Sequence, residues 1–177
     1  LMFSNNKWKK KKLKKPWKVI NTFDFKRIDK VIKNLKSKNI HLSPWIENVF
    51  KNYRSKLSNN DFPLKLYIIQ VKDLDINKPA RLDKIYRYLK NHGYELVPPE
   101  VSLIARNYYK EQKTGEWLRF ATPFRSLVDT DGVPHLPKLG KALKKYFIET
   151  YWSYPKAIFH PHNKFVVRKK WYFKEFK

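Results

Sequence analysis

The first third of the chain has the apolar spacing of two α-helices. In FKRIDKVIKNLKSKN, residues 25–39, apolar side chains recur every three or four positions, which places them on one helix face opposite a lysine-rich face. In HLSPWIENVFKNY, Ser43 suits a helix N-cap and Pro44 suits the first helical turn. The polar stretch SKLSNNDFP that follows predicts a loop. These patterns predict a helical pair over residues 25–53.

Strands dominate the rest of the chain, with two more helices among them. Alternating or β-branched stretches predict strands at 64–74, 115–124, 135–143, 145–152 and 160–173. A helix is predicted to open at Pro79 and to end before Gly93, which suits the first residue past a helix. Another is predicted over residues 98–112. Pro137 and Gly140 weaken the 135–143 strand, which favours a position at the edge of a sheet.

The order of these elements predicts an α+β fold. Helices come first, then a strand, two helices and a run of strands, which favours helices packed on one face of a small antiparallel sheet. We predict a lysine-rich N-terminal arm over residues 1–18, disordered or loosely docked, because Pro16 breaks any helix and like charges repel. One α+β domain over 19–170, with its sheet-containing part at 64–170, and a basic aromatic tail over 171–177 complete the expected organisation.

Composition limits the chemistry. The chain of 177 residues has no cysteine, which excludes disulfides, thiolate zinc sites and cysteine nucleophiles. No apolar run approaches the roughly 18 residues that span a bilayer, and LMFSNN lacks the apolar segment of a secretory signal. We therefore expect a cytoplasmic protein. The nucleotide-binding, acyl-transfer and zincin motifs GxxxxGK[ST], GxGxxG, GxSxG and HExxH do not occur, so no cofactor is predicted.

Charge points to a polyanionic partner. The formal net charge is +25, and residues 1–20 carry eight lysines and no acid. Lysine clusters neutralise phosphates with little base preference, because specific readout favours arginine forks. The predicted function is non-enzymatic, non-specific binding of RNA, DNA or a ribosome. The predicted phosphate contacts are Lys7, Lys9, Lys10, Lys11, Lys12, Lys14, Lys15, Lys18, Arg168, Lys169 and Lys170, with Trp8 and Trp17 as candidates for base stacking.

Other interpretations of the charge stay open. The 32 lysines and 13 asparagines are residues that AT-rich coding sequence favours, so the arm is also explained as a solubilising tail. An anionic membrane surface would attract the same lysines. A third function class is a protein–protein interaction module, which would present a contiguous apolar patch.

Histidines and acids suggest an alternative enzymatic function. His160 and His162, two positions apart on an extended segment, point the same way and could share a metal with His135, Asp129 or Asp131. Such a site would make the protein a metal-dependent hydrolase or nuclease. Surface-loop histidines are the simpler interpretation, and DTDG is better explained as a turn than as a calcium loop, because Pro134 and Leu136 stand where ligands would follow.

Two further groups have structural and functional interpretations. Charged residues around the third helix could hold magnesium but fit salt bridges better; they are Glu100, Arg106, Glu111, Glu116 and Arg119. Aromatic side chains of the C-terminal strands could stack unpaired bases but fit core packing better; they are Trp117, Phe120, Phe147, Tyr151, Trp152, Trp171, Tyr172 and Phe173.

Several segments together resemble a known pattern. SPWIENVF, YELVPPEVSLIARNYYKEQKTGEWLRFATPF, DTDGVP and NKFVVRK are similar to segments of a family of small bacterial proteins for which no activity is known. The resemblance covers roughly residues 17–170. It implies no catalytic residue and no ligand.

Overall fold

Four α-helices and ten strands build the part of the chain that the computed structural model describes, residues 14–23 and 27–169. The helices are α1 (Ile28–Ser37), α2 (Pro44–Phe50), α3 (Leu82–Asn91) and α4 (Val101–Tyr108). The strands are β1 (Lys18–Ile20), β2 (His41–Leu42), β3 (Leu64–Gln70), β4 (Ala80–Arg81), β5 (Tyr94–Glu95), β6 (Trp117–Phe120), β7 (His135–Ala142), β8 (Lys145–Trp152), β9 (Ile158–Phe159) and β10 (Lys164–Lys169). None of these helices is long and apolar enough to cross a bilayer.

Local signals set the start of α2 and the end of α3 where the sequence predicts them. The Ser43 hydroxyl accepts a hydrogen bond from the Ile46 amide and caps α2, with Pro44 in the first turn. Gly93 has φ of +84° just past α3, a conformation that glycine adopts without strain. Two helices are shorter than predicted. α3 begins at Leu82 rather than Pro79, because Ala80 and Arg81 first pair with β9. α4 spans Val101–Tyr108 rather than residues 98–112.

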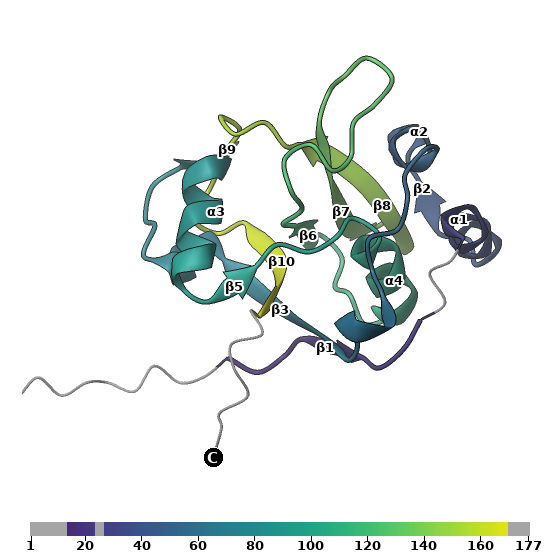
Figure 1. The fold of residues 1–177 in the computed structure, drawn as a ribbon, viewed down its shortest axis with the longest axis horizontal. Coiled ribbons are helices and arrows are strands. Elements are labelled where there is room, and N and C mark those ends of the chain that lie inside the picture. Colours follow the sequence, from purple (N-terminus) through teal and green to yellow (C-terminus); the bar gives the residue numbers. More distant parts are fainter. Residues whose placement is uncertain (1–13, 24–26, 170–177) are drawn as a thin grey trace, which may run out of the picture.

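The main sheet is larger than predicted and mixed, so the predicted small antiparallel sheet is wrong. Its eight strands follow the order β1-β3-β10-β6-β7-β8-β2, with β5 paired to β10 (Figure 1). The β10–β6 and β2–β8 pairs are parallel, and the other pairs are antiparallel. The parallel pair at the centre joins strands far apart in the sequence, with Phe165 opposite Arg119. A local pattern of side chains cannot reveal such a pairing.

Helices cover both faces of this sheet, which also corrects the prediction that they lie on one face. Along β3, Leu64 and Leu66 point into a core shared with α1, α2 and α4. Tyr67 and Ile69 point to the opposite side and join the core under α3. Because side chains of a strand alternate between faces, a nearly continuous apolar run such as LKLYIIQ belongs to a strand buried on both sides.

Strand β7 lies inside the sheet, between β6 and β8, and not at an edge as predicted. Pro137 is tolerated because the β6 ladder spans only positions 138–140 of β7 and ends before the proline. Gly140 is required by close packing: an added Cβ would lie 2.3 Å from the indole ring of Trp117. Pro137 and Gly140 are therefore explained by the register with β6 and by the packing of Trp117, and not by an edge position.

Two buried charged side chains connect α4 and its N-terminal turn to the rest of the fold. The Arg106 guanidinium donates hydrogen bonds to Gln112 Oε1 at 2.6 Å and to the carbonyls of Tyr109 and Gly140 at 2.6 and 3.2 Å. Gln112 in turn donates to the Leu139 carbonyl at 3.1 Å. The side chains of Arg106 and Gln112 thereby join α4 to β7.

Glu100 holds the segment after α2. Its carboxylate is buried, with 1% of the residue exposed, and accepts hydrogen bonds from the Tyr53 and Ser55 hydroxyls and from the Lys56 and Leu57 amides at 2.5–2.8 Å. Burial raises the pKa of the Tyr53 hydroxyl most, and the neighbouring Glu100 carboxylate raises this pKa further. Neutral donors, rather than a cation, therefore satisfy this buried acid.

We predict that Glu100→Ala lowers the free energy of unfolding by about 2–4 kcal/mol, because four donors lose a charged acceptor at once. Glu100→Gln keeps one carbonyl acceptor and should cost clearly less. Denaturant unfolding of the two variants and the parent chain measures both values. Equal stability of the alanine variant and the parent chain would contradict this role.

Candidate anion-binding site

Two cations lie side by side on one face of strands β6 and β7. Alternation along β6 places Trp117 and Arg119 on the same face, while Leu118 and Phe120 point into the core on the other. In the antiparallel β6–β7 ladder, Arg119 lies opposite Lys138. Like charges directly opposite each other in a sheet are destabilising.

Arg119 is half-buried between aromatic rings. Its guanidinium carbon lies 5.2 Å from the ring centroid of Tyr151 and 5.6 Å from that of Phe159. Within the described residues it makes no hydrogen bond or ion pair, and its buried Nε has no partner. Burial lowers the pKa of the guanidinium, which still remains charged at neutral pH. Within the described chain, the Arg119 guanidinium thus contacts two aromatic rings while its hydrogen-bond donors stay free.

Lys138 is held in the same way. Its ammonium lies 4.6 Å from the centroid of the Trp117 ring and 5.6 Å from that of Tyr151. Burial lowers the pKa of Lys138, and the charge of Arg119 lowers it further. Glu149 lies opposite Lys138 on β8 and acts in the other direction, yet the two form no ion pair in the described structure.

The Trp117 ring fixes the position of this pair. The indole lies directly over Gly140, where the missing side chain leaves room for it. There it forms a wall beside the Lys138 ammonium. Two adjacent cations with free donors and apolar walls form a site that suits a phosphate or carboxylate group.

The predicted arm residues that the structure describes are mostly engaged in the fold. Lys14 pairs with Asp73 at 2.7 Å and Lys18 with Glu111 at 2.5 Å, whereas Lys15 is exposed and unpaired within the described chain. Trp17 packs edge-on against Tyr109, with centroids 4.9 Å apart, and its amide donates to Leu66. Trp17 is therefore a packing residue here. Lys7, Lys9, Lys10, Lys11, Lys12, Trp8 and Lys170 lie outside the described residues.

The tail cations that are described also have partners. Arg168 donates to the Leu96 carbonyl and lies 3.3 and 3.6 Å from the carboxylates of Asp61 and Glu95. The Lys169 ammonium lies 4.8 Å from the Tyr67 ring centroid. Arg168 is therefore engaged with two acids and a carbonyl of the fold, whereas Lys169 has no ion pair within the described residues.

The histidines and acids of the predicted metal site do not form one cluster. Asp129 and His135 meet at 2.8 Å, and the other ring nitrogen of His135 lies 2.9 Å from the Thr150 hydroxyl. His160 and His162 stack on each other in the exposed turn before β10. Across residues 14–23 and 27–169, no three histidines or acids are grouped as metal ligands.

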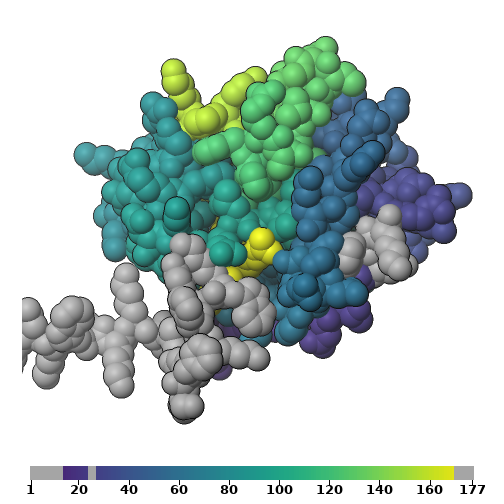
Figure 2. All heavy atoms as spheres, viewed as in Figure 1, coloured from purple at the N-terminus to yellow at the C-terminus, as the bar shows by residue number. Residues whose placement is uncertain are grey.

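Asp129 closes the loop between β6 and β7, which projects from the body of the protein (Figures 1 and 2). Its Oδ1 accepts from the Asp131 and Val133 amides, and its Oδ2 bonds to His135. The Trp45 ring stacks on His135 with centroids 5.5 Å apart. DTDG is therefore a turn, with Gly132 at φ of +80°.

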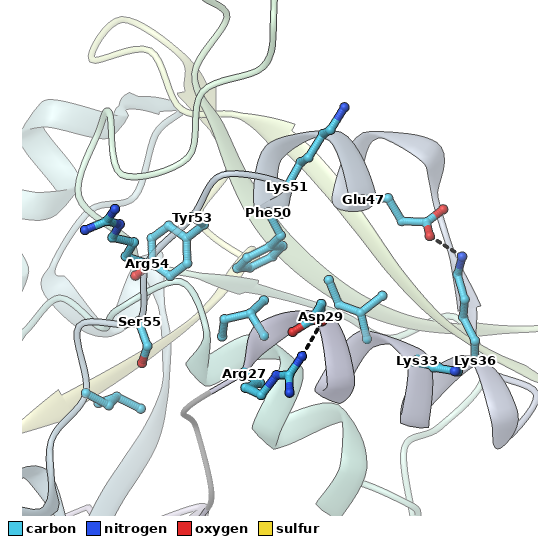
Figure 3. A pocket seen from close by; sticks show the side chains of 13 residues that line it. Arg27, Asp29, Lys33, Lys36, Glu47, Phe50, Lys51, Tyr53, Arg54 and Ser55 are labelled. Carbon is cyan, nitrogen blue, oxygen red and sulfur yellow. Dashed lines mark hydrogen bonds and ion pairs between the residues drawn. The ribbon is translucent and has the colours of Figure 1, made fainter.

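A second cationic surface is the groove between α1 and α2, about 1010 Å³ in volume (Figure 3). Ile32 and Phe50 are among the apolar residues that line it. Two ion pairs, Arg27–Asp29 and Lys36–Glu47, lie along its sides, as the dashed lines show. Three lining cations have no ion pair within the described residues: Lys33, Lys51 and Arg54.

The charged and aromatic groups weighed from the sequence take mixed roles. Glu111 and Glu116 form ion pairs with Lys18 and Lys164. Phe120 is core, Trp152 is exposed, and Trp117 and Tyr151 line the site. Trp171, Tyr172 and Phe173 lie outside the described residues.

Sequence reasoning missed Lys138. The alternation in WLRF would have placed Trp117 and Arg119 on one face, but the register with β7 is visible only in the fold.

The chain matches no family model, no curated protein and no solved structure. This result agrees with a sequence resemblance that brought no known activity.

We predict that Asp129 makes stability acid-sensitive. The hydrogen bond from His135 lowers the pKa of this carboxyl, helped by the Val133 and Asp131 amides. A carboxyl with a lowered folded-state pKa stabilises above its unfolded pKa of about 4 and loses that contribution as pH falls through the folded value. Denaturant unfolding across this acidic range should show a smaller loss of stability for Asp129→Asn than for the parent chain.

Asp131→Asn is the matched control for this acid effect. Asp131 lies in the same turn, but its carboxylate is exposed and has no partner in the described chain. The Asp131→Asn variant should therefore show the same pH dependence of stability as the parent chain. The same acid response in the Asp129 variant as in the parent would contradict the assignment.

Proposed function

We propose that this protein binds RNA or DNA without sequence preference, as a non-enzymatic binding protein. The observation that carries the proposal is the Arg119–Lys138 pair, two adjacent half-buried cations that form no ion pair in the described structure. A backbone phosphate between them would relieve their repulsion and satisfy the free donors of Arg119. No feature of this pair reads a base, so the contact suits any sequence.

The balance of charge over the chain supports a polyanionic partner. The sequence has 40 lysines and arginines but only 15 acids. Many acids are already used inside the fold: Asp61, Asp73, Glu95, Glu111 and Glu116 each pair with a cation. The remaining cations therefore have few internal partners, and release of counterions from a nucleic acid would drive binding.

The arm lysines complete the proposed contacts. Lys7 and Lys9–Lys12 precede Lys14, whose pairing with Asp73 attaches the chain to the fold. Lysines in a row contact phosphates as point charges without selecting a base. We assign them the sequence-independent share of affinity, and the Arg119–Lys138 site a fixed contact on the folded domain.

We predict that Arg119→Gln and Lys138→Gln each reduce affinity for nucleic acid several-fold and lower the slope of log K against log salt by about one, the value for one lost phosphate contact. Fluorescence anisotropy with single-stranded RNA, duplex RNA and duplex DNA at several salt concentrations measures both quantities. Lys90→Gln is the control, because Lys90 is an exposed, unpaired lysine on α3. If all three variants lose affinity equally, the site has no special role.

We predict a larger effect from the arm. Replacing Lys7 and Lys9–Lys12 with glutamine in the full chain removes five charges and should lower the salt slope by about four to five on duplex DNA. Substitution is preferable to a deletion through residue 18, because Trp17 and Lys18 are bonded to β3. An unchanged slope at measurable affinity would show that the arm does not contact phosphates.

A further inference from the structure

The turn between β7 and β8 combines backbone strain with an exposed apolar side chain. Leu143 and Lys144 form a two-residue turn with φ of +48° and +61°. Tight hairpins of this kind need positive φ at both positions and favour asparagine and glycine, because other side chains crowd the backbone there. Leu143 is also 88% exposed, more than any other large apolar residue in the described chain. Neither backbone preference nor burial explains a leucine here.

The hairpin and the loop bonded to it are rich in lysine. Lys141, Lys144 and Lys145 belong to the hairpin itself. The loop after α4 adds Lys110 and Lys113, because the Gly115 amide donates to the Lys141 carbonyl at 2.9 Å and the Tyr146 hydroxyl donates to the Lys110 carbonyl. None of these five lysines has an ion pair in the described structure, and the two nearest acids of that loop, Glu111 and Glu116, are already paired with Lys18 and Lys164.

We infer that the β7–β8 turn is a contact site for the surface of an anionic phospholipid membrane. Leu143 would enter the boundary between headgroups and acyl chains, as apolar residues of peripheral proteins do. The lysines would stay with the headgroup phosphates while their alkyl stems lie along the apolar layer. The contact is peripheral and reversible, because one leucine and a few lysines provide only modest affinity.

The side chain at the tip favours a lipid over a nucleic acid. Leucine has no π-face on which a base could stack, and aromatic residues supply that contact in single-strand binding. The Arg119–Lys138 site has a different character, because its cations lie against aromatic rings. The inference therefore does not rest on the proposed nucleic-acid binding.

Leu143→Asn separates binding from folding. Asparagine suits a left-handed turn position, so the variant should unfold at a higher denaturant concentration than the parent chain. The charge is unchanged, so non-specific attraction by the lysines stays the same. Co-sedimentation of the full chain with vesicles containing phosphatidylserine should nevertheless show binding about tenfold weaker or more, the value of one buried leucine. Leu143→Gly is a second variant with the same expectation.

Three comparisons complete the experiment. Ile158→Thr changes an apolar residue that is 49% exposed on β9, outside the β7–β8 hairpin, and should bind vesicles like the parent. Vesicles of phosphatidylcholine alone should bind weakly. Affinity for duplex RNA should be the same for Leu143→Asn and the parent chain.

The contrary results are equally clear. Equal vesicle binding by Leu143→Asn and the parent, or no binding of the parent chain to phosphatidylserine vesicles at physiological salt, overturns the inference. A parallel loss of vesicle and RNA binding in Leu143→Asn assigns the turn to nucleic acid instead and also overturns it. Loss of RNA binding in the Arg119 and Lys138 variants alone would bear only on the proposed function.

Discussion

The Arg106 guanidinium, buried where α4 meets β7, holds the arrangement on which the candidate site depends. It is 1% exposed and has no carboxylate partner among the described residues. Its charge is satisfied by carbonyl oxygens, including that of Gly140, and by the ring of Tyr146 at 4.6 Å. Gly140 in turn is the residue that makes room for Trp117. The position of α4, the path of β7 and the wall of the anion site are therefore linked through one buried cation.

Glu100 and Arg106, two buried charges of the described chain, are satisfied by neutral partners, whereas Arg119 is not. Neutral donors satisfy Glu100, and neutral acceptors satisfy the two terminal nitrogens of Arg106, although its Nε has no partner in the described chain. Arg119 has stacking contacts but no acceptor within the described chain, and a second cation lies beside it. Proteins tend to break such local rules at functional sites. This contrast, more than the total charge, directs attention to the β6–β7–β8 face.

The sequence revealed local structure well because local physics determines it. The Ser43 cap, the Gly93 terminus and the Gly132 turn each depend on residues close in the chain. Sheet topology was missed, because the parallel pairing of Phe165 with Arg119 depends on contacts across more than forty residues. Gly140 led to a wrong prediction for a related reason. A glycine in a strand indicates either a weakened strand or a neighbour packed closely against the backbone. The register that places Trp117 opposite Gly140 decides for the second.

The candidate site was only partly accessible from the sequence. Arg119 was weighed as a salt-bridge residue beside Glu116, but the two side chains have different partners. Glu116 bonds to Tyr109 and Lys164, whereas Arg119 faces Tyr151. Charge runs drew attention to the arm instead, where Trp17 proved to be a packing residue.

The two proposed contacts differ in the physics that would distinguish them. At the Arg119–Lys138 pair, the cations are half-buried against aromatic rings, so a bound phosphate gains from charge-assisted hydrogen bonds. At the β7–β8 turn, the lysines are largely solvated and screened by salt, so they attract any polyanion weakly. Only the apolar tip of Leu143 can add selectivity there. Changing charge therefore tests the first contact, and changing hydrophobicity at constant charge tests the second.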